Sequence, residues 1–266
     1  MVAAWALEEM GVPFTIIDRG PEWDLPRLAR GCVYFHDRCN MPEEHVRRQQ
    51  IATVLLPSRW KDEVAPTYYH RKIWGDRPYV KNSVEGMVAG KARWSTVWSM
   101  NDALRFLTKR YLYRIAFRDV TRHEVLVASG ERRIISTIPF PLLEPDARCE
   151  SSPLYIYQDT AAPTSLAGEP RFGGYGHVLY NVDQDVAWYR MSSMFGYVSM
   201  EFVKPVGGWR LTQNKKIITS PDADRFEEEH PNIMLTGRWG RWSRGVLGHE
   251  TYYMVKQAFE PGGRWA

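Results

Sequence analysis

The residues best suited to hold a ligand lie in segment 232–249, which reads NIMLTGRWGRWSRGVLGH. An apolar strand leads to Thr236-Gly237-Arg238, a loop rich in glycine and tryptophan follows, and a helix begins near Leu247. Glycine lets a backbone approach a ligand closely, and the first turn of a helix offers unpaired N–H groups to negative charge. The segment therefore predicts a site for an anionic group. A basic, aromatic loop that binds something else is the alternative.

A second candidate is the strand-like segment Asp185–Arg190, which ends in Tyr189 and Arg190. Arginine offers a planar fork of donors, which suits an anionic or carbohydrate ligand. Because neighbours on a strand face opposite sides, we expect at most one of these two side chains to face a pocket. Cross-strand pairing on a solvated face is the alternative.

Potential metal ligands occur at Cys32, His36 and Cys39. Structural zinc takes four ligands, in paired short spacings. Only three are local here and their order fits no common zinc pattern, so we expect no metal site.

The N-terminal segment Val2–Asp18 reads as a helix, a glycine stop and a buried strand that ends in an acid. Ala3, Leu7 and Met10 fall on one helical face, and Gly11 stands where a helix end favours a left-handed residue. In a dinucleotide-binding βαβ unit, an acid at the end of the second strand hydrogen-bonds a ribose hydroxyl.

These segments resemble parts of the FAD-dependent oxidoreductases of the amine oxidase and UDP-galactopyranose mutase type. The opening of that family is a strand, a G-x-G-x-x-G turn, a helix with Leu-Ala-Ala, a glycine, and a strand ending in Glu or Asp. Val2–Ala4, Leu7, Gly11 and Asp18 match that order, but the first strand and the glycine-rich turn are missing. The strand 133–139 and the segment 232–249 resemble a later strand and the closing motif of the family.

The resemblance implies FAD as the cofactor. It assigns Asp18 and Arg19 to the adenosine ribose or phosphate, although Arg19 reads equally well as an exposed loop residue. It assigns Gly237 and Arg238 to the pyrophosphate or ribitol. It further implies two groups of contacts: the flavin and its neighbourhood at Thr137, Pro139, Trp239, Gly245, Val246 and Leu247, and the substrate at Tyr189, Arg190 and Trp242.

The implied function is hydride transfer between flavin and a small organic substrate such as an amine, alcohol or sugar-like compound. One alternative is a UDP-galactopyranose mutase-like enzyme that acts on a nucleotide sugar. Another is a truncated, catalytically inactive flavoprotein remnant that serves as a binding protein. The sequence identifies no catalytic residue.

The expected fold class is α/β, with a Rossmann-like FAD/NAD(P)-binding domain that lacks its first strand. We assign residues 1–36, 99–141 and 207–266 to this domain. Residues 37–98 and 142–206 form an interleaved substrate domain with an antiparallel sheet, because short aromatic strands there alternate with turns. Locally, we expect a helical face at 42–50, an irregular segment at 64–80 and a strand at 124–128.

The composition and net charge of the chain favour some classes of function over others. The chain has 266 residues and a net charge of +4, with acids and bases interspersed, which implies neither nucleic-acid nor membrane binding. The sequence shows no apolar run of membrane-spanning length and no signal peptide. Three cysteines indicate a reducing compartment, so we expect a cytoplasmic protein. The resemblance implies a small-molecule substrate. The oligomeric state stays open.

Overall fold

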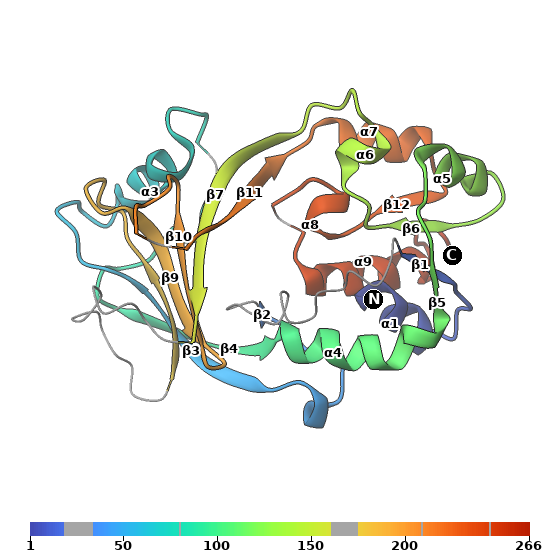
Figure 1. Cartoon of the computed structure of the whole chain (residues 1–266), viewed down its shortest axis with the longest axis horizontal. Helices are drawn as coiled ribbons and strands as arrows, with labels where there is room; N and C mark the ends of the chain where they lie inside the picture. The colour runs from blue at the N-terminus through green and yellow to red at the C-terminus, as the bar shows by residue number, and fades with distance from the viewer. Residues whose placement is uncertain (19–33, 80, 161–174, 209, 245) are drawn as a thin grey trace.

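Two lobes lie side by side in the computed structural model, one built on a large curled sheet and one on helices with short strands (Figure 1). The structure describes residues 1–18, 34–79, 81–160, 175–208, 210–244 and 246–266. We call the two parts the sheet lobe and the α/β lobe. The long strands of residues 150–159 and 212–219 run from the sheet lobe toward the α/β lobe.

The sheet lobe contains eight strands in the order β11-β7-β10-β9-β8-β3-β4-β2. All neighbouring pairs are antiparallel except β3 and β8, which are parallel, so the sheet is mixed. Helix α3 (Ala65–Trp74) packs on it through a core that includes Tyr69 and Tyr189. The strands are β2 (Tyr34–Phe35), β3 (Arg48–Leu55), β4 (Ala92–Ser99), β7 (Glu150–Asp159), β8 (Gly176–Tyr180), β9 (Trp188–Met194), β10 (Tyr197–Phe202) and β11 (Thr212–Thr219).

The α/β lobe contains two pairs of parallel strands. β1 (Ile16–Asp18) pairs with β5 (Ile115–Phe117), and β6 (Ile134–Ser136) pairs with β12 (Ile233–Leu235). The surrounding helices are α1 (Val2–Glu9), α4 (Met100–Tyr111), α5 (Arg122–Ser129), α6 (Phe140–Leu143), α7 (Asp222–Glu229), α8 (Gly237–Gly240) and α9 (Gly248–Phe259), with 3-10 turns at Glu43–His45 and Leu112–Arg114.

One hydrophobic core joins helices α1, α4 and α9 to both strand pairs. Leu107, Tyr111 and Val255 are fully buried in it, and Ile16 of β1 and Ile135 of β6 pack against it. The short strands are therefore fixed mainly by the helices that cover them. This burial is the main source of stability for strands of only three residues.

Several sequence predictions are confirmed. The N-terminal helix is α1, and Gly11 adopts the left-handed φ of 68° after it. Ser99 caps α4 by accepting a hydrogen bond from the backbone N–H of Asp102. The structure also confirms a mixed α/β fold and short aromatic strands between residues 150 and 202.

Three local predictions are wrong. Segment 64–80 is not irregular throughout, because Ala65–Trp74 form α3, and Pro66 lies in its first turn, where a missing N–H is tolerated. Residues 124–128 form part of α5 and not a strand, because Thr121 and Glu124 make a capping box that starts a helix. Segment 42–50 is a short 3-10 turn followed by β3, whose pairing with β4 and β8 overrides its helical charge spacing.

The eight-stranded sheet includes strands from segments that we assigned to the cofactor-binding domain. β11 pairs with β7 and so extends the sheet lobe, although residues 207–266 were assigned to the cofactor-binding domain. β2, within residues 1–36, pairs with β4 of the same sheet.

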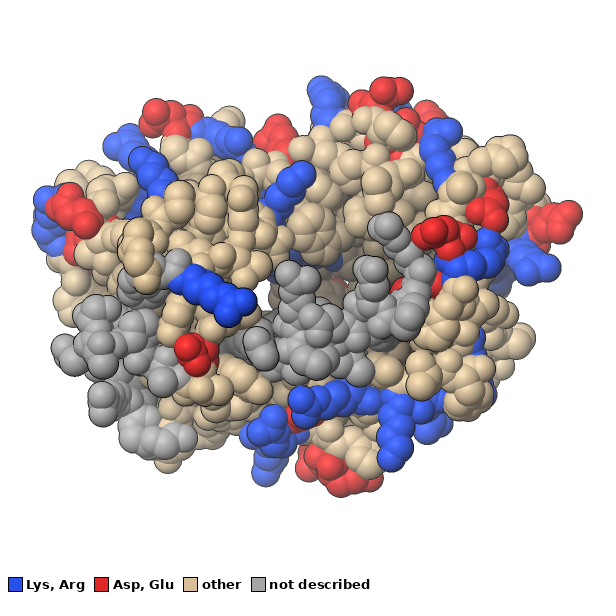
Figure 2. All heavy atoms as spheres, viewed as in Figure 1, with Lys and Arg blue, Asp and Glu red and all other residues tan. Residues whose placement is uncertain are grey.

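None of the helices within the described residues has both the length and the apolar character that crossing a lipid bilayer requires. On the face shown in Figure 2, Lys and Arg alternate with Asp and Glu over both lobes.

A candidate anion-binding pocket

A pocket of about 590 Å³ lies between the sheet lobe and α8, a volume in the range of small-molecule sites. We call it the cationic pocket. Strands β7, β9, β10 and β11 form its floor, and α3, α8 and the segment 81–83 form its walls. Its lining residues include Tyr69, Trp74, Lys81, Leu154, Ile156, Gln158, Arg190, Ser199, Glu201, Asn214, Lys215, Lys216, Arg238, Trp239 and Arg244.

The charges of this lining are strongly unequal. Six of the lining residues are Lys or Arg and only one, Glu201, is acidic. Like charges that converge on a cavity raise the local concentration of the opposite charge. The arrangement therefore suits an anionic ligand, while Trp74 and Trp239 offer aromatic faces beside it.

Glu201 is the electrostatic centre of the pocket floor. It is 6% exposed and lies opposite Arg190 in the register of β9 and β10, and the two side chains form an ion pair. Burial would raise the pKa of Glu201, but Arg190 and Lys216 outweigh it and hold the pKa below its ordinary value. Burial would likewise lower the pKa of Arg190, and Glu201 outweighs it. Both groups are therefore charged at neutral pH.

A β-bulge brings Tyr189 to the same carboxylate. Glu201 pairs with Arg190 and Phe202 pairs with Trp188, so Tyr189 is the extra residue on its strand. The Tyr189 hydroxyl donates to Oε2 of Glu201 at 2.5 Å. This bulge interrupts the simple alternation expected for Tyr189 and Arg190, so both side chains contact Glu201. Of the two, Arg190 lines the pocket and Tyr189 is buried beneath it.

Lys216 reaches this cluster from β11. Its Nζ donates to the Tyr189 hydroxyl at 3.2 Å and lies 3.9 Å from Oε2 of Glu201. Only 22% of its side chain is exposed. Burial lowers the pKa of Lys216 to about 7; Glu201 raises this pKa, and Arg190, Arg238 and Arg244 lower it.

One donor in the pocket floor lacks an acceptor. The buried Nε of Arg190 makes no hydrogen bond to any of the described residues. A buried donor without a partner costs free energy. A bound anion that reached the Arg190 guanidinium would offset that cost.

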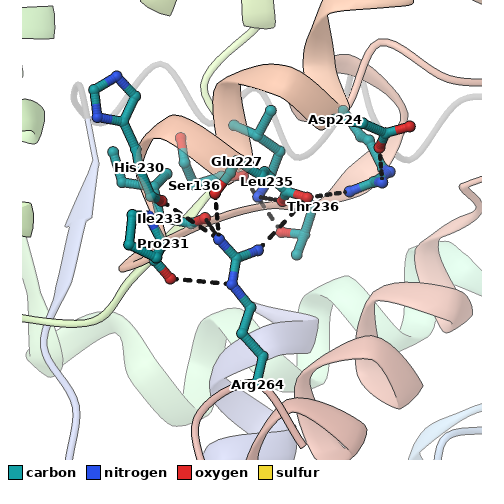
Figure 3. A network of polar contacts seen from close by, with 10 residues as sticks. Ser136, Asp224, Glu227, His230, Pro231, Ile233, Leu235, Thr236 and Arg264 are labelled. Atoms are coloured by element: carbon teal, nitrogen blue, oxygen red, sulfur yellow. Dashed lines mark hydrogen bonds and ion pairs between the residues drawn. The ribbon is translucent and has the colours of Figure 1, made fainter.

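The wall formed by α8 is anchored by a polar network around Glu227 of α7 (Figure 3). Its carboxylate accepts from the backbone N–H of Leu235 at 2.5 Å and from Arg241, just after α8, at 2.6 Å. Arg264 near the C-terminus donates to the carbonyls of Glu227 and Ile233, both at 2.9 Å. The network fixes the end of β12 and thereby the start of α8.

Gly240 explains how closely α8 packs on β6. A Cβ at this position would lie 2.9 Å from the carbonyl oxygen of Ser136 and 3.1 Å from Cα of Thr137. Only glycine allows this approach. It holds α8, and with it Arg238 and Trp239, at the mouth of the pocket.

The structure brings together three residues expected in different roles. Arg190, expected at the substrate, and Arg238 and Trp239, expected at the cofactor, all line the cationic pocket. Trp242, expected at the substrate, is instead 3% exposed in the α/β lobe core, where its indole N–H donates to the Glu150 carbonyl. It is a packing residue.

The other expected cofactor residues lie at strand and helix ends of the α/β lobe. Asp18 ends β1, Thr137 follows β6 and Pro139 precedes α6. Gly237 begins α8 with a φ of 72°, and Val246 and Leu247 precede α9. Glu250 caps α9 by accepting from the Leu247 N–H. Arg19 and Gly245 lie outside the described residues.

Sequence reasoning missed Glu201, Lys216, Arg244 and Trp74. Glu201 lies within β10 and Lys216 follows Lys215 in β11, two strands away, so their proximity arises only in the folded sheet. A usable signal exists in segment 212–219, TQNKKIIT, whose β-branched residues are typical of a strand.

No protein-family model matches the chain, and no curated protein shows a significant match. The function is therefore argued from the arrangement of residues alone.

Proposed function

We propose that this chain is an FAD-dependent oxidoreductase-like protein, with the cofactor on the α/β lobe and an anionic substrate in the cationic pocket. The observation that carries the proposal is the pairing of the four short parallel strands. The strands of a doubly wound sheet lie side by side in the order 3-2-1-4-5, where the numbers give their order along the chain. Strands β1, β5, β6 and β12 fit positions 2, 3, 4 and 5 of this sheet, respectively. The two observed pairs are then 3-2 and 4-5, and the described residues supply no strand for position 1.

The residues at the strand ends fit parts of FAD. Asp18 ends the strand in the second position, where an acid binds the adenosine ribose in such folds. At Gly237, no atom lies within 4 Å of the position that a Cβ would take, so the backbone at the end of β12 is open to a ligand. The pyrophosphate-binding turn of such folds is not among the described residues. When bound, flavin would accept or donate a hydride.

The chain's own residues would bind and orient the substrate. Arg190 and Arg238 would hold its anionic group, since guanidinium groups bind carboxylates and phosphates through paired hydrogen bonds. Trp74 and Trp239 would exclude water from the space beside it.

A second candidate is a UDP-galactopyranose mutase-like enzyme. The excess of Lys and Arg in the pocket favours it, because a nucleotide sugar carries two phosphate charges, whereas a simple amine is cationic at neutral pH. The two candidates differ in the ligand and share the cofactor.

Equilibrium dialysis with FAD and a visible absorption spectrum test the proposal. We expect bound flavin that survives gel filtration, and bleaching by an oxidisable substrate would separate the oxidoreductase from the mutase. The same measurement should be made on the chain extended by any coding sequence that continues the reading frame upstream of Met1. The absence of flavin from both forms would refute the cofactor and leave the pocket as a binding site only.

A further inference from the structure

Lys216 has the surroundings of a reactive amine. It lines the cationic pocket, and 22% of its side chain is exposed. Its Nζ lies 4.4 Å from the ring centre of Tyr189 and 5.6 Å from that of Trp74. Aromatic faces on two sides restrict the direction from which a ligand approaches and reduce the hydration of the amine.

The charges around Lys216 keep part of it neutral near pH 7. The groups that face it are Glu201 of β10 and Arg190 of β9, two and three strands away in the sheet, Tyr189 beneath it, and Arg238 and Arg244 across the pocket. The carboxylate of Glu201 raises the Lys216 pKa, but burial outweighs it. The Lys216 pKa of about 7 follows. An unprotonated lysine is the nucleophilic form.

We propose that Lys216 is a nucleophile that forms an imine with a carbonyl compound bearing an anionic group. Arg190 and Arg238 would hold the anion while the carbonyl carbon faces Nζ. The Nζ lone pair forms the new C–N bond, and the carbonyl oxygen leaves as water with the two amine protons. The Tyr189 hydroxyl, in contact with both Lys216 and Glu201, is placed to relay these protons.

Lys72 offers an internal comparison. Its burial lowers the pKa to about 8, so its amine is also unusually acidic. However, Nζ donates to the Asp183 carbonyl at 2.5 Å and to the Asn181 side chain at 3.4 Å. It does not line the cationic pocket. A low pKa without access should therefore leave Lys72 unreactive.

Pyridoxal 5′-phosphate, an aldehyde with a phosphate, tests the inference. The purified full chain is incubated with this aldehyde, reduced with borohydride and mapped by peptide mass spectrometry. We expect labelling at Lys216 that exceeds labelling by pyridoxal, which lacks the phosphate, by about tenfold, the effect of one charge-assisted hydrogen bond. Inorganic pyrophosphate should protect Lys216, and the rate should rise with pH around 7.

Two variants serve as controls. Lys216→Arg keeps the positive charge but removes the amine, so it should abolish the specific label while circular dichroism confirms folding. Lys91→Gln removes an exposed lysine outside the pocket and should leave the label unchanged. Equal labelling by pyridoxal and its phosphate, or labelling spread over exposed lysines with none at Lys216, would overturn the inference.

The inference rests on the proposed anionic substrate of the pocket and not on the flavin. A protein that takes the label but binds no FAD would refute the cofactor proposal alone. A protein that binds FAD but leaves Lys216 unlabelled would refute the inference alone.

Discussion

Replacing Glu201 with Gln tests the electrostatics of the pocket floor. The carboxylate is 6% exposed and contacts Arg190, Tyr189 and Lys216. Glu201→Gln keeps the shape but removes the charge. The Arg190 guanidinium then remains in the floor without a counter-ion, and the pKa of Lys216 falls further, because Glu201 is the group that raises it.

The expected loss of stability is large for one substitution. Breaking a buried ion pair by removing one partner costs about 3–5 kcal/mol, because the other charge stays buried. Arg190 is not fully buried, with 32% of its side chain exposed, so we expect the lower end, about 3 kcal/mol. In a chain of this size such a loss lowers Tm by about 6–12 °C.

Urea unfolding at pH 7, followed by circular dichroism, measures this loss. Glu43→Gln is the matched control, because Glu43 pairs with Arg38 at the surface with 62% of its side chain exposed, and should cost less than about 1 kcal/mol. A change at Glu201 no larger than at Glu43 would refute a buried, charged floor. In a double-mutant cycle, Glu201→Gln with Arg190→Met should lose less than the sum of the single losses.

The pKa shift of Glu201 predicts how the stability of the folded protein changes with pH. The folded pKa of Glu201 lies below its ordinary value of 4.5. The Glu201 carboxylate therefore contributes its full stabilisation of the folded state above about pH 4.5. This contribution is lost as the pH falls through the folded pKa of Glu201. Stability curves of the native protein and of Glu201→Gln should converge over that acidic range. A constant difference down to pH 3 would contradict this assignment.

Three further predictions concern the scaffold and the ligand. Gly240→Ala should lower stability by about 1–3 kcal/mol in thermal unfolding, because its Cβ would overlap the Ser136 carbonyl, whereas Gly207→Ala, with open space around it, should change little. Thr121→Ala removes the cap of α5 and should cost about 1 kcal/mol in urea unfolding; a neutral result would mean that the cap is not formed. Arg238→Met should weaken pyrophosphate binding in calorimetry by about tenfold or more without lowering Tm, and unchanged affinity would remove Arg238 from the ligand.

The sequence predicts those parts of the fold and of the site whose sequence signals lie within one short segment. Helix α4 is predictable because its cap and its apolar face lie within one segment. In α5, a run of consecutive apolar residues suggests a strand. The capping box at the start of this segment favours the helix that is observed. Arg190 is a recognisable ligand candidate by chemistry. Its partners Glu201 and Lys216 are not, because they lie on other strands and come close to Arg190 only in the folded sheet.

The most direct test of the account is whether flavin remains bound to the purified protein. The account predicts an absorption spectrum of bound FAD, in the chain as written or in its upstream-extended form, and a loss of affinity of about tenfold or more in Asp18→Ala, which removes the expected ribose contact. A protein that carries no flavin in either form would contradict the assignment of the α/β lobe as a cofactor-binding domain.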